Sequence, residues 1–390
     1  MAGRRDGVRR QRTKQKFFFD YTLLFIVSFL ICFGLIMLYS TSAYEANLDF
    51  EDSAFFLKKQ IKATILGVIV MVIVAAIDYH LWERFAMLAY IVSAVLIALV
   101  MTPLGYSANG ARRWLNLGGM SLQPAEVAKV GMIIFFASLV CKMGAGIRNR
   151  KGFLFTVLWA VPISAEILFI TSNLSSAIII FGIVLMMLFV ASPNYKGYVI
   201  GALCIIFVSA VMVLAISKGV IPEDLSYRFS RIKAWLNPEA YSSGSGFQTL
   251  QALYAIGSGG LFGKGLGQSM QKLGFLPEAQ NDMIFSIICE ELGLFGAAAV
   301  IILFLLLIWR FMVIANNAQD LFGALLVVGT MAHMSIQVIL NIAVVTNSIP
   351  NTGITLPFIS YGGSSVVFLL IEIGMVLNVS SSIKLENSGR

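Results

Sequence analysis

The chain has 390 residues and a formal net charge of +8, with 58% hydrophobic residues, 12% charged residues and a mean hydropathy of +0.85. Soluble globular proteins carry about 25% charged residues. The composition therefore excludes a soluble globular protein and indicates one that lives in a membrane.

The N-terminus is strongly basic, because Lys and Arg residues crowd the first sixteen positions against the single acid Asp6. The positive-inside rule places this tail, residues 1–18, in the cytoplasm. A basic tail could also bind nucleic acid. A short tail before a first transmembrane helix is explained by topology and anionic lipid, however, so we expect no nucleic-acid partner.

Ten apolar runs follow, most of them about 18 residues or longer and able to cross a bilayer as helices. They cover residues 19–40, 61–77, 85–102, 124–141, 153–170, 174–192, 197–217, 283–309, 321–346 and 363–383. The sequence thus predicts an all-α polytopic membrane protein with ten transmembrane helices and both termini cytoplasmic. Residues 19–383 form a single membrane domain, and residues 384–390 form a cytoplasmic tail.

The four cysteines all fall inside apolar segments, and none stands in a CxxC or metal-ligand spacing. They are most simply small buried hydrophobic residues. We expect neither a disulfide nor a zinc site.

Two polar elements come before and within the fourth run. Arg112 and Arg113 adjoin Trp114, as expected of a segment on the outer surface near phosphate head groups. Glu126 and Lys129 stand three residues apart on a predicted helix, so they share a face and can pair. A structural salt bridge and a direct catalytic role both stay open for this pair.

The seventh loop, residues 218–282, is the longest and is predicted to be extracytoplasmic. A structureless loop of this length is improbable in a compact protein, so it should contain helices of its own. Arg228 and Arg231 stand three residues apart and could clamp a diphosphate, because guanidinium groups bind phosphate oxygens bidentately. A basic surface that touches anionic lipid is the alternative.

The end of this loop has charged residues up to the start of the eighth apolar run. Residues 263–293 read GKGLGQSMQKLGFLPEAQNDMIFSIICEELG and include Lys272, Glu278 and Asp282. A carboxylate held where water meets lipid suggests chemistry there. Asp282 also suits the position of an N-cap, since it comes just before a predicted helix.

The ninth run carries a polar stripe, because His333, Gln337 and Asn341 recur every four residues on one helix face. Interhelical hydrogen bonding is the ordinary explanation, and a polar pathway is the alternative. Residues 350–365 then read PNTGITLPFISYGGSS. The two prolines and three glycines indicate a re-entrant loop whose backbone donors open the last helix at Ser364, a natural place for an anion.

These segments closely resemble the motifs of the SEDS family of bacterial cell-wall proteins, the FtsW/RodA/SpoVE group. The resemblance runs through nearly the whole chain in the family's order. The matching motifs are GARRW, QPSE-x-x-K, YR-x-x-R, G-x-G-x-G-x-S-x-x-K with LPE and EELG, and P-x-x-G-x-x-LP-x-x-SYGGSS. The chain departs from them at Ala125, at Asn173 in place of the acid of a PDLG-like run, and at Gln280-Asn281 in place of the commoner HT before the aspartate.

The resemblance implies a peptidoglycan glycosyltransferase that polymerises lipid II at the outer face of the cytoplasmic membrane, for cell division or sporulation. Glycosyl transfer with inversion needs a base for the attacking hydroxyl and cations for the departing diphosphate. Asp282 is the candidate base. The candidate substrate-binding residues are Arg231, Lys272, Glu278, Arg112, Arg113, Glu126, Lys129 and Ser364.

The resemblance also implies partners: a class B penicillin-binding protein, which is a transpeptidase, and other division or sporulation membrane proteins. A divalent cation, Mg²⁺ or Mn²⁺, could assist the diphosphate, although no acidic cluster specifies one. Two other functions stay open, a lipid II flippase and a non-catalytic division scaffold. The polar groups concentrate on the outer side, as a polymerase needs, and no internal repeat supports alternating access.

Overall fold

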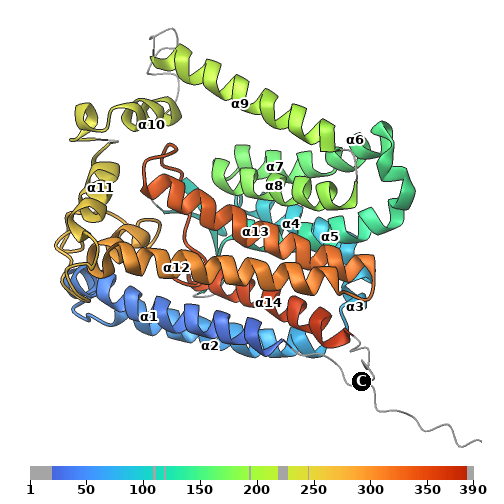
Figure 1. Cartoon of the computed structure of the whole chain (residues 1–390), viewed down its shortest axis with the longest axis horizontal. Coiled ribbons are helices and arrows are strands. Elements are labelled where there is room, and N and C mark those ends of the chain that lie inside the picture. Colours follow the sequence, from blue (N-terminus) through green and yellow to red (C-terminus); the bar gives the residue numbers. More distant parts are fainter. Residues whose placement is uncertain are drawn as a thin grey trace, which may run out of the picture.

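The computed structural model describes residues 20–383, apart from 109–110, 118–119, 193–194, 218–226 and 245. The two predicted tails, residues 1–18 and 384–390, lie outside the described residues. Most of the long helices lie side by side in one bundle (Figure 1). The predicted fold class, an all-α polytopic membrane protein, is confirmed.

Each of the ten predicted apolar runs contains a helix. Segments that are apolar on all sides suit helices that are surrounded by other helices and by lipid. The helices of these runs are α1 Tyr21–Phe50, α2 Phe55–Ala76, α4 Ala86–Leu99, α5 Pro124–Met143, α6 Arg150–Leu158, α7 Ala160–Phe169, α8 Leu174–Ala191, α9 Tyr195–Ser217, α12 Ile284–Asn316, α13 Leu321–Val345 and α14 Gly363–Ser382.

Within the described residues, nine helical segments are long and apolar enough to cross a membrane, with α6 and α7 counted together as Arg150–Phe169. The remaining one, α4, has 14 residues. At 1.5 Å per residue it spans about 21 Å, which is short of the roughly 30 Å hydrocarbon core. The number of ten transmembrane helices therefore stays a prediction.

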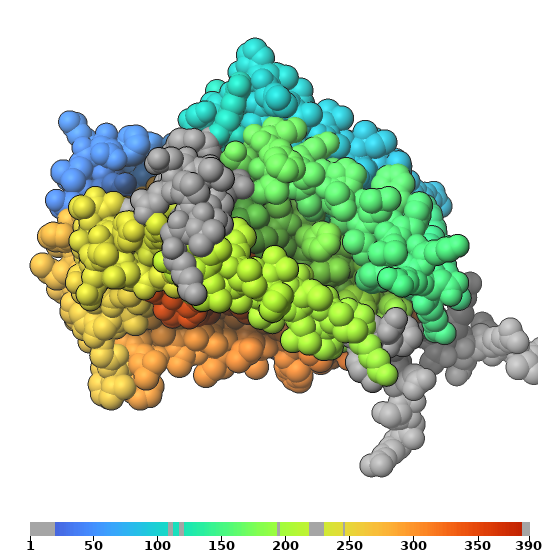
Figure 2. Space-filling view, turned by 90° about the horizontal axis from the view of Figure 1, so that it is seen from above, coloured from blue at the N-terminus to red at the C-terminus, as the bar shows by residue number. Residues whose placement is uncertain are grey.

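The helix α13 forms the centre of the bundle, where it packs against α5, α8, α12 and α14. Two thirds of its apolar window, 67%, is buried inside the protein, whereas the corresponding share for α9 is 6%. Figure 2 shows α9 as a separate yellow-green ridge on one face. Polar side chains on α13 are therefore inside the bundle, and α9 offers its side chains to lipid.

A small antiparallel sheet interrupts the bundle between α4 and α5, in the order β1-β2-β3. Its strands are β1 Gly105–Ala108, β2 Ala111–Leu117 and β3 Met120–Leu122. Trp114 lies opposite Tyr106, and Leu115 lies opposite Leu122. The sequence predicted only a surface segment here, because such short strands give little periodic signal.

The long loop contains helices, as predicted: α10 Tyr227–Leu236, the 3-10 helix η3 Glu239–Tyr241 and α11 Phe247–Gly259. α11 packs against α12 at one end of the bundle (Figure 1). Two further short helices, α3 His80–Arg84 and η1 Gly144–Arg148, connect α2 with α4 and α5 with α6.

The helix α12 is broken at Gly293, where φ is 67° and ψ is −166°. A Cβ atom at this position would lie 2.3 Å from the backbone nitrogen of Gly263, so only glycine fits both the conformation and the contact. The loop after α11 crosses α12 here, because the N–H groups of Lys264 and Gly265 donate to the carbonyl oxygens of Glu290 and Glu291 at 2.9 Å.

Candidate active site

The candidate base, Asp282, lies in the last turn of the long loop and is 7% exposed. α12 begins two residues later, with Met283 at the N-cap position and no side-chain capping bond. The interpretation of Asp282 as an N-cap is therefore wrong, since its carboxylate does not serve the end of the helix. A buried carboxylate without a capping role needs another explanation.

Two helices of the long loop and the distant loop after α13 converge on Asp282. From α11, Nε2 of Gln248 donates to Oδ1 of Asp282 at 3.5 Å and to the carbonyl of Pro277 at 3.1 Å. Oε1 of Gln248 accepts from Nδ2 of Asn351 at 2.7 Å. From α10, Nη1 of Arg231 donates to the carbonyl of Asn351 at 3.0 Å. The carboxylate, an amide and a guanidinium group thus share one site.

Burial raises the pKa of Asp282, the negative charge of Glu278 raises it further, and Arg231 lowers it, so that the pKa is about 7. Glu278 adopts a φ of 58°, and its Oε2 accepts a hydrogen bond from Nδ2 of Asn281. A carboxylate whose pKa lies near neutral pH can exchange a proton under ordinary conditions. Asp282, Glu278 and Arg231, all named from the sequence, are brought together.

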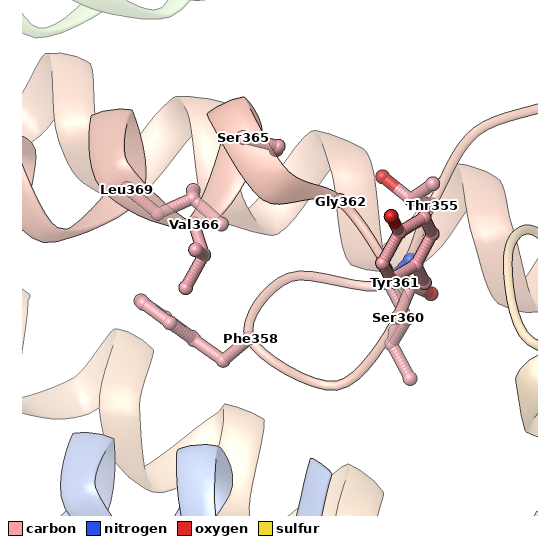
Figure 3. A pocket seen from close by; sticks show the side chains of 9 residues that line it. Thr355, Phe358, Ser360, Tyr361, Gly362, Ser365, Val366 and Leu369 are labelled. Carbon is pink, nitrogen blue, oxygen red and sulfur yellow. The ribbon is translucent and has the colours of Figure 1, made fainter. Parts of the chain in front are cut away.

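The loop between α13 and α14, residues 346–362, covers this site. It comes close to the carboxylate, since a Cβ atom at Gly353 would lie 3.8 Å from Oδ2 of Asp282. Nε2 of Gln337 donates to the carbonyl of Thr355 at 3.0 Å and so holds the loop to α13. Phe358 of the loop and Val366 of α14 face each other across a small pocket between the loop and the start of α14, with Thr355 and Tyr361 to one side (Figure 3).

The predicted pairing of Glu126 and Lys129 is confirmed, because Nζ of Lys129 lies 2.7 Å from Oε1 of Glu126 and both side chains are buried. The pair belongs to a chain of polar contacts in the bundle interior. The other contacts are Ser365 Oγ to Glu126 Oε2 at 3.2 Å, Lys129 Nζ to Gln337 Oε1 at 3.3 Å, His333 Nε2 to Gln337 Oε1 at 2.8 Å and His333 Nδ1 to Glu372 at 2.9 Å. The polar stripe of α13 is thus engaged in hydrogen bonds between helices.

Lys272 lies in a different buried cluster. Its Nζ is 2.7 Å from Oε1 of Glu291 and 2.9 Å from Oγ of Ser40 on α1. Beside it, Oε1 of Glu290 accepts from Nζ of Lys264 at 2.7 Å. Glu290 and Glu291 thereby tie the glycine-rich loop to α12. These two glutamates were not among the predicted site residues, although their position in an otherwise apolar helix was a usable signal.

The remaining predicted substrate-binding residues have backbone partners or lie elsewhere. Nη2 of Arg112 donates to the carbonyls of Thr102 and Gly105, at 2.6 and 3.0 Å. Arg113 donates to the carbonyl of Thr171 at 3.1 Å. Ser364 lies in the first turn of α14, where its buried Oγ has no partner within the described residues.

A metal site is not evident within the part of the chain that the structure describes, where no three His, Cys, Asp or Glu side chains gather as ligands. Asp282 and Glu278 are two neighbouring oxygen donors. Mg²⁺ commonly binds through one or two carboxylates together with substrate phosphates. The donor set therefore suits a cation that arrives with a diphosphate.

Comparison with known proteins gives a consistent result. A family model described as cell cycle protein, for FtsW, RodA and SpoVE, matches residues 21–385. The chain is 41% identical over 363 residues to stage V sporulation protein E of Bacillus subtilis, covering 93% of this chain and 96% of that protein. It is 38% identical to a probable peptidoglycan glycosyltransferase FtsW of Trichlorobacter lovleyi, covering 94% of each chain.

Two solved structures share the fold. A chain in a peptidoglycan synthase complex that coordinates polymerization and crosslinking is similar with a TM-score of 0.77 at 25% identity, covering 94% of this chain and 99% of that one. The rod shape determining protein RodA of Thermus thermophilus is similar with a TM-score of 0.66 at 24% identity, covering 94% and 98%.

Proposed function

The chain belongs to the FtsW/RodA/SpoVE family of cell cycle proteins, and from this membership we propose that it is a peptidoglycan glycosyltransferase that polymerises lipid II. Relatives at 35 to 38% identity are named probable peptidoglycan glycosyltransferases. The reaction would serve cell division or sporulation, because the family model is described as a cell cycle protein and the relatives include a sporulation protein. It would occur at the outer face of the cytoplasmic membrane, with both termini of this integral membrane protein in the cytoplasm.

The observation that carries the proposal is the buried carboxylate of Asp282, with a pKa of about 7, beside Arg231 and Gln248. Chain growth requires a sugar hydroxyl to attack the anomeric carbon that bears the diphosphate. The new C–O bond forms as the bond to the diphosphate breaks. A base with a pKa near the working pH takes up the hydroxyl proton most effectively. Asp282 is our candidate for that base.

The departing diphosphate needs positive charge as its own charge develops. Of the predicted cations, Arg231 has the best support, because its charge acts on Asp282 from α10. Lys272 is engaged with Glu291, and Lys129 is engaged with Glu126. These two lysines therefore suit a structural role better. Among these three residues, Arg231 is therefore our candidate for contact with the phosphate groups.

A divalent cation, Mg²⁺ or Mn²⁺, would supply further stabilisation of the diphosphate when bound. Glu278 is the residue that would hold it, together with the phosphate oxygens, because a carboxylate bound to the cation would not take up the hydroxyl proton as Asp282 is proposed to do. The chain itself buries the carboxylate of Asp282 and places the charges of Glu278 and Arg231 near it.

A class B penicillin-binding protein is the proposed partner, with other division or sporulation membrane proteins around it. The likeness to a chain in a peptidoglycan synthase complex supports this assignment. Under this proposal the partner catalyses transpeptidation, and this chain catalyses glycosyl transfer only.

The direct test is to incubate the purified full-length protein with lipid II, with and without its partner and with and without Mg²⁺. We expect glycan chains on a gel, and their absence under all four conditions would refute the polymerase assignment. A parallel measurement in lipid vesicles distinguishes a polymerase from the alternative, a lipid II flippase. Movement of labelled lipid II across the bilayer without glycan formation would identify a flippase.

A further inference from the structure

Three consecutive backbone carbonyl groups lead up to the candidate base, and each accepts a hydrogen bond from α13 or from the loop that follows it. The three bonds are Tyr361 N to Gln280 O at 2.9 Å, Ser360 Oγ to Asn281 O at 2.6 Å and Asn341 Nδ2 to Asp282 O at 2.8 Å. Three adjacent attachments leave this segment little freedom to rotate.

Asn341 has a particular place in this arrangement, because it is fully buried on α13. Its Nδ2 donates to the carbonyl of Asp282 and also to the carbonyl of Ile354, at 2.7 Å. Both neighbours are acceptors, so the amide nitrogen, and not the oxygen, must face them. One side chain thus joins the segment of the base to the loop that covers it.

Ser360 has a similar double role. Its Oγ accepts from the backbone N–H of Leu356 at 2.8 Å and donates to the carbonyl of Asn281. Its hydroxyl therefore connects the same loop to the same segment, one residue before the base. The two side chains reach neighbouring carbonyls from α13 and from its following loop.

We propose that Asn341, together with Ser360, is a positioning residue that fixes the backbone of Asp282 and so aims its carboxylate at the attacking hydroxyl. This inference rests on the assignment of Asp282 as the base in the proposed function. A misplacement of about 1 Å at a reacting group can lower a rate about 100-fold, even when the altered residue does not touch substrate. A clamp on the backbone prevents such a displacement.

A matched control exists at the opposite end of the bundle. Asn378 on α14 is also buried, donates from Nδ2 to the carbonyl of Ala75 at 2.7 Å and accepts from the N–H of Tyr79 at 2.8 Å. Asn378→Leu removes hydrogen bonds of the same kind without touching the candidate site. Asn341→Leu and Asn378→Leu therefore separate positioning from general stability.

The experiment measures kcat and KM for lipid II polymerisation by the full-length protein with its partner. We expect Asn341→Leu to lower kcat about 100-fold with KM changed less than about 2-fold, because the bound substrate is unaffected. Ser360→Ala should lower kcat by a smaller factor, and Ser360→Thr, which keeps the hydroxyl, should restore it. Asn378→Leu should keep the kcat of the unaltered protein.

The double variant Asn341→Leu with Asp282→Asn tests whether Asn341 acts through the base. If it does, the double variant is no slower than Asp282→Asn alone. A folded Asn341→Leu protein with normal kcat, beside an inactive Asp282→Asn protein, would overturn the positioning role alone. An active Asp282→Asn protein would overturn the base and the positioning role together. If Asn341→Leu does not fold, a normal kcat for Ser360→Ala overturns the proposal.

Discussion

Glu278 and Asp282 lie in one short loop, and the negative charge of Glu278 helps to hold the pKa of Asp282 at about 7. This relationship links two carboxylates that differ in exposure, since Asp282 is buried and Glu278 is half-buried. Two carboxylates in different environments are a recurrent means of setting one of them near neutral pH. The effect of Glu278 on the pKa of Asp282 should therefore appear in the pH dependence of the reaction.

The first prediction concerns Asp282→Asn. This change removes the base while keeping the size of the side chain, so we expect polymerisation to fall by about 10²- to 10⁴-fold. The stability should not fall. The pKa of Asp282 in the folded protein, about 7, exceeds the ordinary value of 3.8. The native state therefore favours the protonated form, and this stabilisation is lost as the pH rises through 7.

Above that pH the unaltered protein carries a buried charge, which the asparagine does not. Thermal unfolding at about pH 8 should then show Asp282→Asn to be at least as stable as the unaltered protein. A variant that is inactive because it is unfolded would contradict this prediction, and so would a well-folded variant with near-normal polymerisation.

The second prediction concerns pH and Glu278. Since the base acts when it is deprotonated, the initial rate should rise with pH and reach half its maximum near pH 7. Glu278→Gln removes a negative charge that raises this pKa, so the midpoint should move to lower pH. Glu278→Asp keeps a carboxylate and is the matched control. An unchanged midpoint in Glu278→Gln would show that the charge of Glu278 does not raise the pKa of the base.

The third prediction concerns the buried ion pair of Glu126 and Lys129, whose charged atoms lie 2.7 Å apart. Removing one partner leaves the other charge buried, which typically costs about 3 to 5 kcal/mol in the free energy of unfolding. We expect Glu126→Gln with Lys129→Met to be more stable than either single variant. Equal or lower stability of the double variant would show that the two side chains are not coupled.

The fourth prediction distinguishes two roles for Lys272. If its ion pair with Glu291 holds the glycine-rich loop, Lys272→Met should lower the unfolding temperature, and adding Glu291→Gln should recover part of it. If Lys272 instead binds phosphate, Lys272→Met should raise KM for lipid II at unchanged stability. Thermal unfolding and steady-state kinetics of the same preparations decide between these outcomes.

The fifth prediction concerns topology. Ser243 is exposed in the segment between η3 and α11. A cysteine introduced as Ser243→Cys should react from outside intact cells with a reagent that does not cross the membrane. Protection from this reagent, with labelling after the membrane is opened, would place the long loop on the cytoplasmic side.

Much of the fold was predictable because hydropathy and helical spacing are local properties. The apolar runs located the helices, and the spacing of Glu126 and Lys129 predicted their pairing. The short helix α4 was predicted as a longer apolar run, because hydropathy does not report where a helix ends. The strands β1 to β3 were not predicted, because each is only a few residues long and gives little periodic signal.

The candidate site was predictable only in part. Asp282, Glu278 and Arg231 were named from motifs, yet the contact of Gln248 with Asp282 and Asn351 depends on the packing of α11 against the loop after α13. The pairing of Lys272 with Glu291 bridges 19 residues across a loop. No periodic pattern in the sequence reports such contacts, because they arise when separate elements fold together.

The break at Gly293 divides α12 into two helical pieces, and the loop after α11 is bonded to both of them. Before the break this loop donates to the carbonyl groups of Glu290 and Glu291, and after the break it accepts from the N–H groups of Leu294 and Phe295. The part after the break has 23 residues and is about 35 Å long, enough to cross the bilayer without the part before it. Helices adapt to bilayers of different thickness by tilting. The two bonds of Leu294 and Phe295 oppose such a tilt next to Gly293, and the preceding part, which carries Glu290 and Glu291 and leads from Asp282, packs on α11. The loop after α11 thus joins the bilayer-crossing piece of α12 to the piece that leads from Asp282.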